Sequence, residues 1–119
     1  MKKIVTVFVC STVFVLNSCM SEKGMPIPKG IVCDSVISYS TSIAPLVALQ
    51  CEPCHSGSSP AGGYDFSTYE TVKAKADDGR LQATVVDNKT MPQPGSGYDL
   101  TEEERLKFAC WISQGAPNN

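Results

Sequence analysis

Cys51-Glu52-Pro53-Cys54-His55 is the richest group of reactive side chains in this 119-residue sequence, and His55 is its only histidine. The two thiols stand about one helical turn apart, and the imidazole follows the second directly. A thioredoxin-like redox pair would need a βαβ context, which the surrounding sequence does not show. A closed zinc site would need four ligands, whereas this stretch offers three within five residues.

The spacing C-x-x-C-H is the attachment signature of c-type haem. Thiols one turn apart can add to the two vinyl groups of one porphyrin, and the adjacent imidazole then reaches the iron from the proximal side. We therefore expect Cys51 and Cys54 to hold one covalent haem c, with His55 as an axial ligand. Because the chain has a single histidine, bis-histidine ligation within one monomer is excluded.

Met91 is the candidate for the opposite axial position. It follows His55 by 36 residues and lies in a loop-like segment between two helical patterns. Such a loop can present a thioether across the haem face, and His/Met ligation is found in cytochromes c. The alternative is that Met91 is hydrophobic filler. A segment flanked by Lys89 and Gln93 is an unusual place for a core side chain, which favours ligation.

The N-terminal residues have the pattern of an export signal. A basic start precedes the uncharged, mostly apolar run Ile4–Leu16, whose 13 residues are too few for a stable transmembrane helix. The following residues resemble a lipobox, so we expect residues 1–18 to be a lipoprotein signal peptide and Cys19 to be lipidated. The alternative is an ordinary signal peptide cut nearby. Residues 19–32, rich in Pro and Gly, then form a flexible tether.

This interpretation predicts an exported protein, anchored by lipid to a membrane and facing the periplasm. Met20 gives no signal for retention in the inner membrane, so we expect the outer membrane. Removal of two signal-peptide lysines leaves 8 Lys and Arg against 12 Asp and Glu, a net charge of about −4. That balance argues against nucleic acid as a partner and is compatible with a basic protein surface.

The six cysteines separate into groups. Cys10 lies in the signal peptide, Cys19 is the lipid acceptor, and two belong to the C-x-x-C-H stretch. Cys33 and Cys110 remain, and in an oxidising compartment two such thiols usually pair. A disulfide between them would close a loop of about 78 residues. The alternative is two buried, unpaired thiols.

The remaining pattern predicts an all-α domain at residues 33–119, with long loops and no alternating strands. Helices are expected from Thr41 or Ser42 to Cys51 and over residues 67–76, 81–86 and 102–114. The last is the clearest, because Thr101 and Glu104 form a capping box and Gly115 suits the C′ position. A domain of this size has few apolar side chains for a core, so a buried haem and a disulfide would stabilise it.

Three further stretches, taken in order with the C-x-x-C-H stretch, resemble a family of small monohaem c-type cytochromes, often lipoproteins, like those of Bacteroidota and Planctomycetes. They are Met91-Pro92, Leu100-Thr101-x-x-Glu104-Arg105 and Trp111-Ile112-x-x-Gly115-Ala116-Pro117-Asn118. The resemblance covers nearly all of residues 33–119. It implies a cytochrome c-like fold of three to four short helices around one haem, with Met91 opposite His55 and with Cys33 and Cys110 paired.

The function expected from these features is electron transfer by a monomeric, membrane-anchored cytochrome that exchanges electrons with partner proteins. No catalytic constellation is visible, so we do not expect an enzyme. Two alternatives remain open. The protein is a haem-based sensor of small ligands if Met91 does not ligate or is displaced, or it is an accessory haem subunit of an oxidoreductase.

Overall fold

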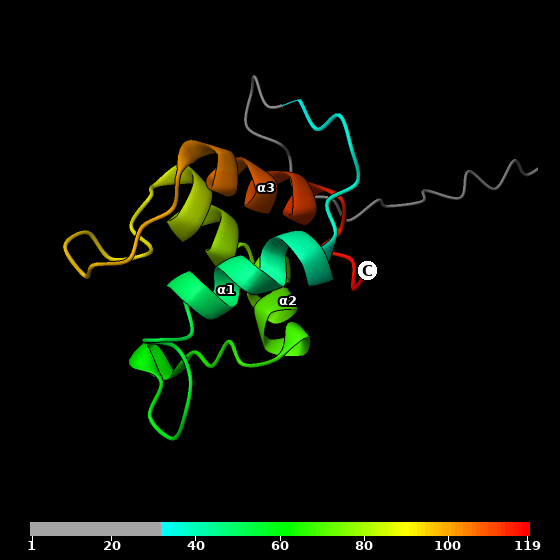
Figure 1. The fold of residues 1–119 in the computed structure, drawn as a ribbon. Helices are drawn as coiled ribbons and strands as arrows, with labels where there is room; N and C mark the ends of the chain where they lie inside the picture. Colours follow the sequence, from blue (N-terminus) through cyan, green and yellow to red (C-terminus); the bar gives the residue numbers. More distant parts are fainter. Residues whose placement is uncertain (1–31) are drawn as a thin grey trace, which may run out of the picture.

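The chain from residue 32 to residue 119 folds into short helices joined by long loops, and these are the residues that the computed structural model describes (Figure 1). The predicted signal peptide, Cys19 and the tether up to residue 31 lie outside the described residues. The elements are, in order, η1 (Tyr39–Ile43), α1 (Ala44–Gln50), η2 (Ala61–Gly63), α2 (Tyr69–Asp77), η3 (Gln82–Asp87) and α3 (Glu102–Ser113). No strand occurs in this range, so the all-α prediction is confirmed. No helix within it is long and apolar enough to cross a membrane.

The first helix begins earlier than the sequence indicated. Its cap is Ser38, whose side chain accepts the backbone N–H of Thr41 at 3.3 Å, so the expectation of a cap at Thr41 or Ser42 is wrong. The reason is that η1 is wound as a π-helix and runs directly into α1, which lengthens the helix on its N-terminal side. Pro45 lies in the first turn of α1, directly after η1. The helix ends at Cys51, which places the two thiols at its C-terminal end.

The middle helices lie close to their predicted positions. Thr68 caps α2 by accepting the N–H of Thr71 at 3.3 Å. The predicted helix over residues 81–86 is present as η3, but it is π-helical rather than α-helical. In this winding the N–H of Asn88 bonds the carbonyl of Ala83, five residues back, at 2.9 Å. The next carbonyl, that of Thr84, is thereby left for the loop that follows.

Both ends of α3 are those that its sequence predicts. The hydroxyl of Thr101 accepts the N–H of Glu104 at 3.2 Å, and the Glu104 carboxylate accepts the N–H of Thr101 at 2.8 Å. At the other end Gly115 has a φ of +87°, a left-handed conformation that favours glycine. The N–H groups of Gly115 and Ala116 then bond the carbonyls of Ile112 and Trp111, which is a Schellman motif.

The core forms where α3 packs against η1 and η3. In the view of Figure 1, α3 lies above α1 and α2 lies below it. Trp111, Phe108 and Ile43 are fully buried. The ring of Tyr39 lies edge-on to Tyr69, with centroids 4.9 Å apart, and 5.5 Å from Trp111. These contacts hold the start of the first helix against the end of the last.

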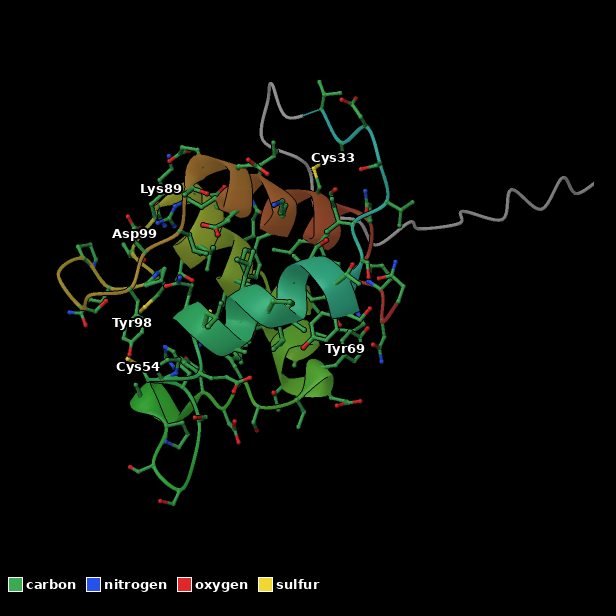
Figure 2. The ribbon with its side chains drawn as sticks, in the orientation of Figure 1. Cys33, Cys54, Tyr69, Lys89, Tyr98 and Asp99 are labelled. Atoms are coloured by element: carbon green, nitrogen blue, oxygen red, sulfur yellow. A yellow bond between two sulfur atoms is a disulfide. The ribbon has the colours of Figure 1, made fainter. Side chains whose placement is uncertain are left out.

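The two ends of the domain are joined covalently and by hydrogen bonds. The Sγ atoms of Cys33 and Cys110, the pair left over in the sequence, are bonded at 2.05 Å (Figure 2). The side-chain amide of Gln114 accepts the N–H of Ile37 and donates to the carbonyl of Ser35, both at 2.9 Å. The carbonyl of Asn119 accepts the N–H of Ser40 at 3.0 Å. This closed end lies on the opposite side of the molecule from Cys54 in Figure 2.

Candidate functional site

The C-x-x-C-H stretch forms a tight turn at the end of α1. The carbonyl of Cys51 accepts the N–H groups of Cys54 at 3.2 Å and of His55 at 2.9 Å. Both thiols are free; Cys51 is buried, with 8% of its surface exposed, and Cys54 is exposed. The turn therefore presents one sulfur toward the interior and the other toward the surface, with the imidazole between α1 and the loop that follows.

The orientation of His55 is fixed through one ring nitrogen. Its Nδ1 lies 3.0 Å from the carbonyl oxygen of Ala61 and 3.2 Å from that of Tyr64. A carbonyl can only accept, so Nδ1 carries a proton, and in the neutral imidazole Nε2 is the nitrogen with the lone pair. The ring of Phe66 packs 5.1 Å from the imidazole, centroid to centroid. A metal-ligating histidine usually binds the metal through one ring nitrogen and donates the N–H of the other to an acceptor such as a carbonyl, which is the arrangement of Nδ1 here.

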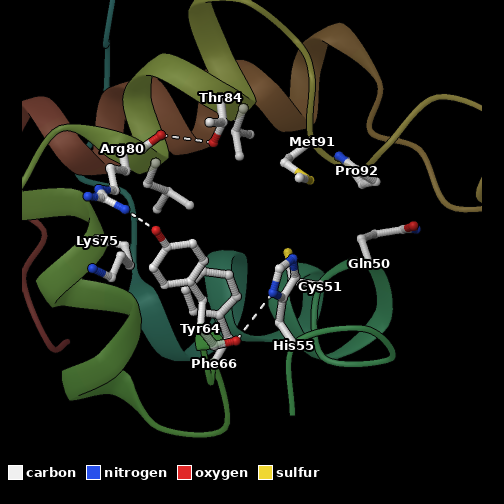
Figure 3. A pocket seen from close by; sticks show the side chains of 12 residues that line it. Gln50, Cys51, His55, Tyr64, Phe66, Lys75, Arg80, Thr84, Met91 and Pro92 are labelled. Atoms are coloured by element: carbon white, nitrogen blue, oxygen red, sulfur yellow. Dashed lines mark hydrogen bonds between the residues drawn. The ribbon is translucent and has the colours of Figure 1, made fainter. Parts of the chain in front are cut away.

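Met91 is held on the other side of the same space. Its backbone N–H donates to the carbonyl of Thr84 at 3.0 Å, and the N–H of Thr90 shares that acceptor at 2.8 Å. The Thr84 carbonyl is available because η3 ends in a π-helical turn. Figure 3 shows Met91 across the cavity from His55. The residue is 37% exposed, which is unusual for a thioether that only fills a core.

A cavity of about 330 Å³ separates the two candidate ligands (Figure 3). Its walls come from α1 and the turn after it, the segment before α2, the helices α2 and η3, and the Met91 loop. The lining residues are Gln50, Cys51, His55, Tyr64, Phe66, Lys75, Arg80, Leu81, Thr84, Val85, Met91 and Pro92. A second hollow of about 220 Å³ lies on the Cys54 side and shares Gln50, His55, Tyr64, Met91 and Pro92 with the first. His55 and Met91 thus line both hollows, one of which is lined by Cys51 and the other by Cys54.

One rim of the cavity is basic, although most of its wall is apolar. The guanidinium of Arg80 donates a hydrogen bond to the hydroxyl of Tyr64. The ammonium of Lys75 lies 4.9 Å from the centroid of the Tyr64 ring, and the guanidinium carbon of Arg80 lies 5.4 Å from it. Two cations therefore stand beside one aromatic ring at the cavity wall. Nothing in the sequence pattern indicated this pair, because the two residues belong to different helical segments.

The structure weakens the two other interpretations of the cysteine pair. A reactive redox thiol has a lowered pKa and commonly sits at a helix N-terminus, whereas Cys51 is at the C-terminus of α1. Burial, reinforced by Glu52 and Cys54, raises the pKa of Cys51 to about 11. Within residues 32–119, no three side chains of His, Cys, Asp or Glu gather in a way that could hold a metal ion. A zinc site at the C-x-x-C-H stretch lacks its further ligands there.

Arg105 belongs to one of the stretches that resemble the cytochrome family, but no role at the site was expected for it. Only 6% of its surface is exposed, and it donates to the carbonyls of Val85 and Met91. The sequence places it in the second turn of a charged helix, where a solvent-exposed arginine is the ordinary expectation. The sequence separations of Arg105 from Val85 and from Met91 do not match a helix or strand period, so only the tertiary structure shows that these residues are in contact.

Comparison of the chain with protein-family models, with curated proteins and with solved structures found no match.

Proposed function

We propose that the protein is a monohaem c-type cytochrome with a cytochrome c-like fold, and that it transfers single electrons. The observation that carries the proposal is the pair of adjoining cavities lined by both His55 and Met91, of which one is also lined by Cys51 and the other by Cys54. A C-x-x-C-H stretch at the mouth of an apolar cavity that also presents a thioether is the donor set of a covalently held haem.

The chain's residues fit this group in their chemistry as well as in their placement. The two thiols are free and stand on one turn, as attachment to two vinyl groups requires. The apolar wall, which includes Phe66, Leu81 and Val85, suits a porphyrin face. Lys75 and Arg80 are suited to pair with the porphyrin carboxylates, because each cation lies on the wall of the same cavity.

His55 and Met91 would hold the iron of a bound haem from opposite walls of the cavity, and a substrate would then have no position at it. His55 keeps Nε2 available through the Nδ1 bond, and Met91 is tied by its backbone to η3. When bound, the haem would supply the Fe(III)/Fe(II) couple, and the chain supplies two axial ligands, an apolar surrounding and two nearby cations. A thioether ligand and an apolar pocket both favour a raised potential. These features support electron transfer rather than catalysis.

The partners we propose are redox proteins that meet the domain near Cys54. Residues 93 and 95–99 of the adjoining loop are exposed there and, apart from Asp99, carry no charge. Such contacts are small and short-lived. We further propose that Cys19 carries the lipid and that residues 19–32 tether a monomeric domain to the outer membrane on its periplasmic side.

A small-ligand sensor is the second candidate, and one observation favours it. Met91 is 37% exposed, so an external ligand such as carbon monoxide could reach its position if the thioether dissociated. The two functions differ in the ferric spectrum. Stable thioether ligation gives a weak band at about 695 nm, whereas an open position gives a high-spin spectrum.

The test is expression in a host that matures c-type cytochromes, followed by mass spectrometry and optical titration. We expect one covalently added haem, and none when Cys51 and Cys54 are both replaced by alanine. Met91→Leu keeps the size of the side chain but removes the sulfur, so the haem should stay attached while the 695 nm band disappears and the potential falls. Leu49→Ala, at an exposed position of α1 that lines neither hollow, is the control, with band and potential unchanged. Colourless wild-type protein without added mass refutes the proposal.

A further inference from the structure

Arg105 is buried inside the domain, far from the exposed position that its sequence context suggests. Its side chain is 8% exposed, and a guanidinium cannot lose its charge at any ordinary pH. Burying such a group costs free energy unless its donors are all matched by acceptors. In the described part of the chain, no buried side-chain nitrogen or oxygen lacks a partner. The partners of Arg105 therefore explain why it is there.

Those partners belong to three different segments. Nη1 donates to the carbonyl of Val85 in η3 at 2.7 Å and to the carbonyl of Met91 at 3.0 Å. Nη2 donates to Oδ1 of Asp99 at 3.0 Å. The planar guanidinium can satisfy acceptors in several fixed directions at once, which a lysine cannot do. α3 thus holds the end of η3, the Met91 loop and the segment before α3 together through one side chain.

The same network reaches the other wall of the cavity. The side-chain oxygen of Gln50 accepts the backbone N–H of Asp99 at 3.2 Å. Gln50 is the residue directly before Cys51 and itself lines the cavity. A continuous path of hydrogen bonds therefore joins the end of α1, which carries the thiols, to the loop that carries Met91. Movement of the loop away from α1 breaks at least one bond of this path.

Both backbone polar groups of Met91 are therefore hydrogen-bonded. Its N–H donates to Thr84, and its carbonyl accepts from Arg105. The loop beyond it, residues 92–99, forms no helix and contains Gly95 and Gly97. Without the Arg105 bonds, this stretch keeps the Thr84 contact, the bond of Asp99 to Gln50 and an exposed ion pair between Lys89 and Glu102, none of which reaches the Met91 carbonyl.

We propose that Arg105 is a positioning residue that keeps the Met91 sulfur at the cavity, and so determines how firmly the axial thioether is held. This inference rests on the proposed function. The arginine does not touch the iron ligand's sulfur; it acts through the Met91 carbonyl and through Asp99.

The experiment compares holoprotein variants by two readouts recorded during heating, the band at about 695 nm and the far-UV circular dichroism. Arg105→Met removes the hydrogen-bond donors, whereas Arg105→Lys keeps the positive charge but loses the planar guanidinium that donates in several directions. Lys89→Met is the matched control, because it removes the exposed ion pair of the same loop and leaves the Met91 carbonyl bonded. The midpoint potential is measured for each.

We expect Arg105→Met to lose most of the band at a temperature where the helices are still intact, with a lowered potential, and Arg105→Lys to lie between it and the wild type. Lys89→Met should match the wild type. If Arg105→Met does not fold, Asp99→Ala and Gln50→Ala remove single links of the path and should each lower the temperature at which the band is lost.

Band loss that coincides with loss of helix in every variant, together with an unchanged potential, would overturn the inference, because Arg105 would then contribute only to folding. A wild-type protein that binds haem but lacks a band dependent on Met91 would overturn it differently, by removing the ligation on which it rests. The Met91→Leu variant separates these two failures.

Discussion

Removal of the Cys33–Cys110 disulfide tests whether the domain depends on a covalent link that is separate from the proposed haem site. The perturbation is the double substitution Cys33→Ser and Cys110→Ala, which leaves no unpaired thiol behind. Serine suits the partly exposed position 33, and alanine suits position 110, where the side chain is 3% exposed. The closed end and Cys54 lie on opposite sides of the molecule in Figure 2, so the cavity should not change.

The magnitude follows from the length of the loop that the bond closes. For a sequence separation of 77 residues the chain-entropy relation predicts a contribution of about 4.5 kcal/mol to the free energy of unfolding. Measured contributions are commonly smaller, since the unfolded chain retains structure. The hydrogen bonds of Gln114 to Ile37 and Ser35 remain in the variant and keep the folded ends together. We therefore expect a loss of about 2 to 4.5 kcal/mol.

The assay is urea unfolding of the oxidised holoprotein, followed by far-UV circular dichroism, with the haem spectrum recorded on the same samples. Ser113→Ala is the control: its hydroxyl donates to the Cys110 carbonyl at 2.8 Å, and its loss should cost about 1 kcal/mol or less. A loss below about 1 kcal/mol in the double variant would refute the loop argument. A changed haem spectrum at low urea would refute the independence of the two ends.

Three further predictions concern single side chains. Thr101→Ala should lower the free energy of unfolding by about 1 kcal/mol through loss of the α3 cap, as urea unfolding will show, and should leave the potential unchanged. Burial, with the charge of the Glu52 carboxylate, raises the pKa of Tyr39 in the folded protein. The neutral phenol therefore contributes fully to stability below the pKa of tyrosine in the unfolded chain, about 10, and this contribution is lost as the pH rises above that pKa. Tyr39→Phe should therefore reduce the alkaline loss of stability between about pH 9 and 11, and equal losses in both proteins would contradict this. Arg80→Leu removes a cation from the cavity wall and should lower the midpoint potential by tens of millivolts, since about 1 kcal/mol corresponds to roughly 40 mV for one electron; an unchanged potential would place Arg80 away from the haem carboxylates.

Local signals in the sequence were sufficient for the parts of the fold that depend on neighbouring residues. The capping box of Thr101 and Glu104 predicts the start of α3, and Gly115 predicts its end, because each interaction spans only a few residues. The start of the first helix was missed for a related reason. The stretch contains Ser38, Ser40, Thr41 and Ser42, each of a residue type that can cap a helix, and the structure uses the first of them.

Tertiary contacts explain what the sequence could not show of the candidate site. The C-x-x-C-H stretch and Met91 were identifiable from residue type and order alone. The hydrogen bond of His55 to the carbonyl of Ala61, by contrast, involves a backbone atom that any residue would provide. The same holds for the bonds of Arg105 to Val85 and Met91, because backbone carbonyls accept them and the residue types at these positions do not predict such bonds. Backbone acceptors are therefore the part of this site that only a structure reveals.

The placement of the closed end also bears on how the domain would work at a membrane. The chain enters the described domain beside Cys33, which is bonded to α3, while Cys54 lies on the opposite side of the molecule (Figure 2). A tether that ran from a lipidated Cys19 would pull on the domain at the disulfide. The Cys33–Cys110 bond and the contacts of Gln114 join the segments at that end, and the Met91 loop takes no part in them. The side near Cys54 would face away from the point of attachment. A redox partner would need access to that side.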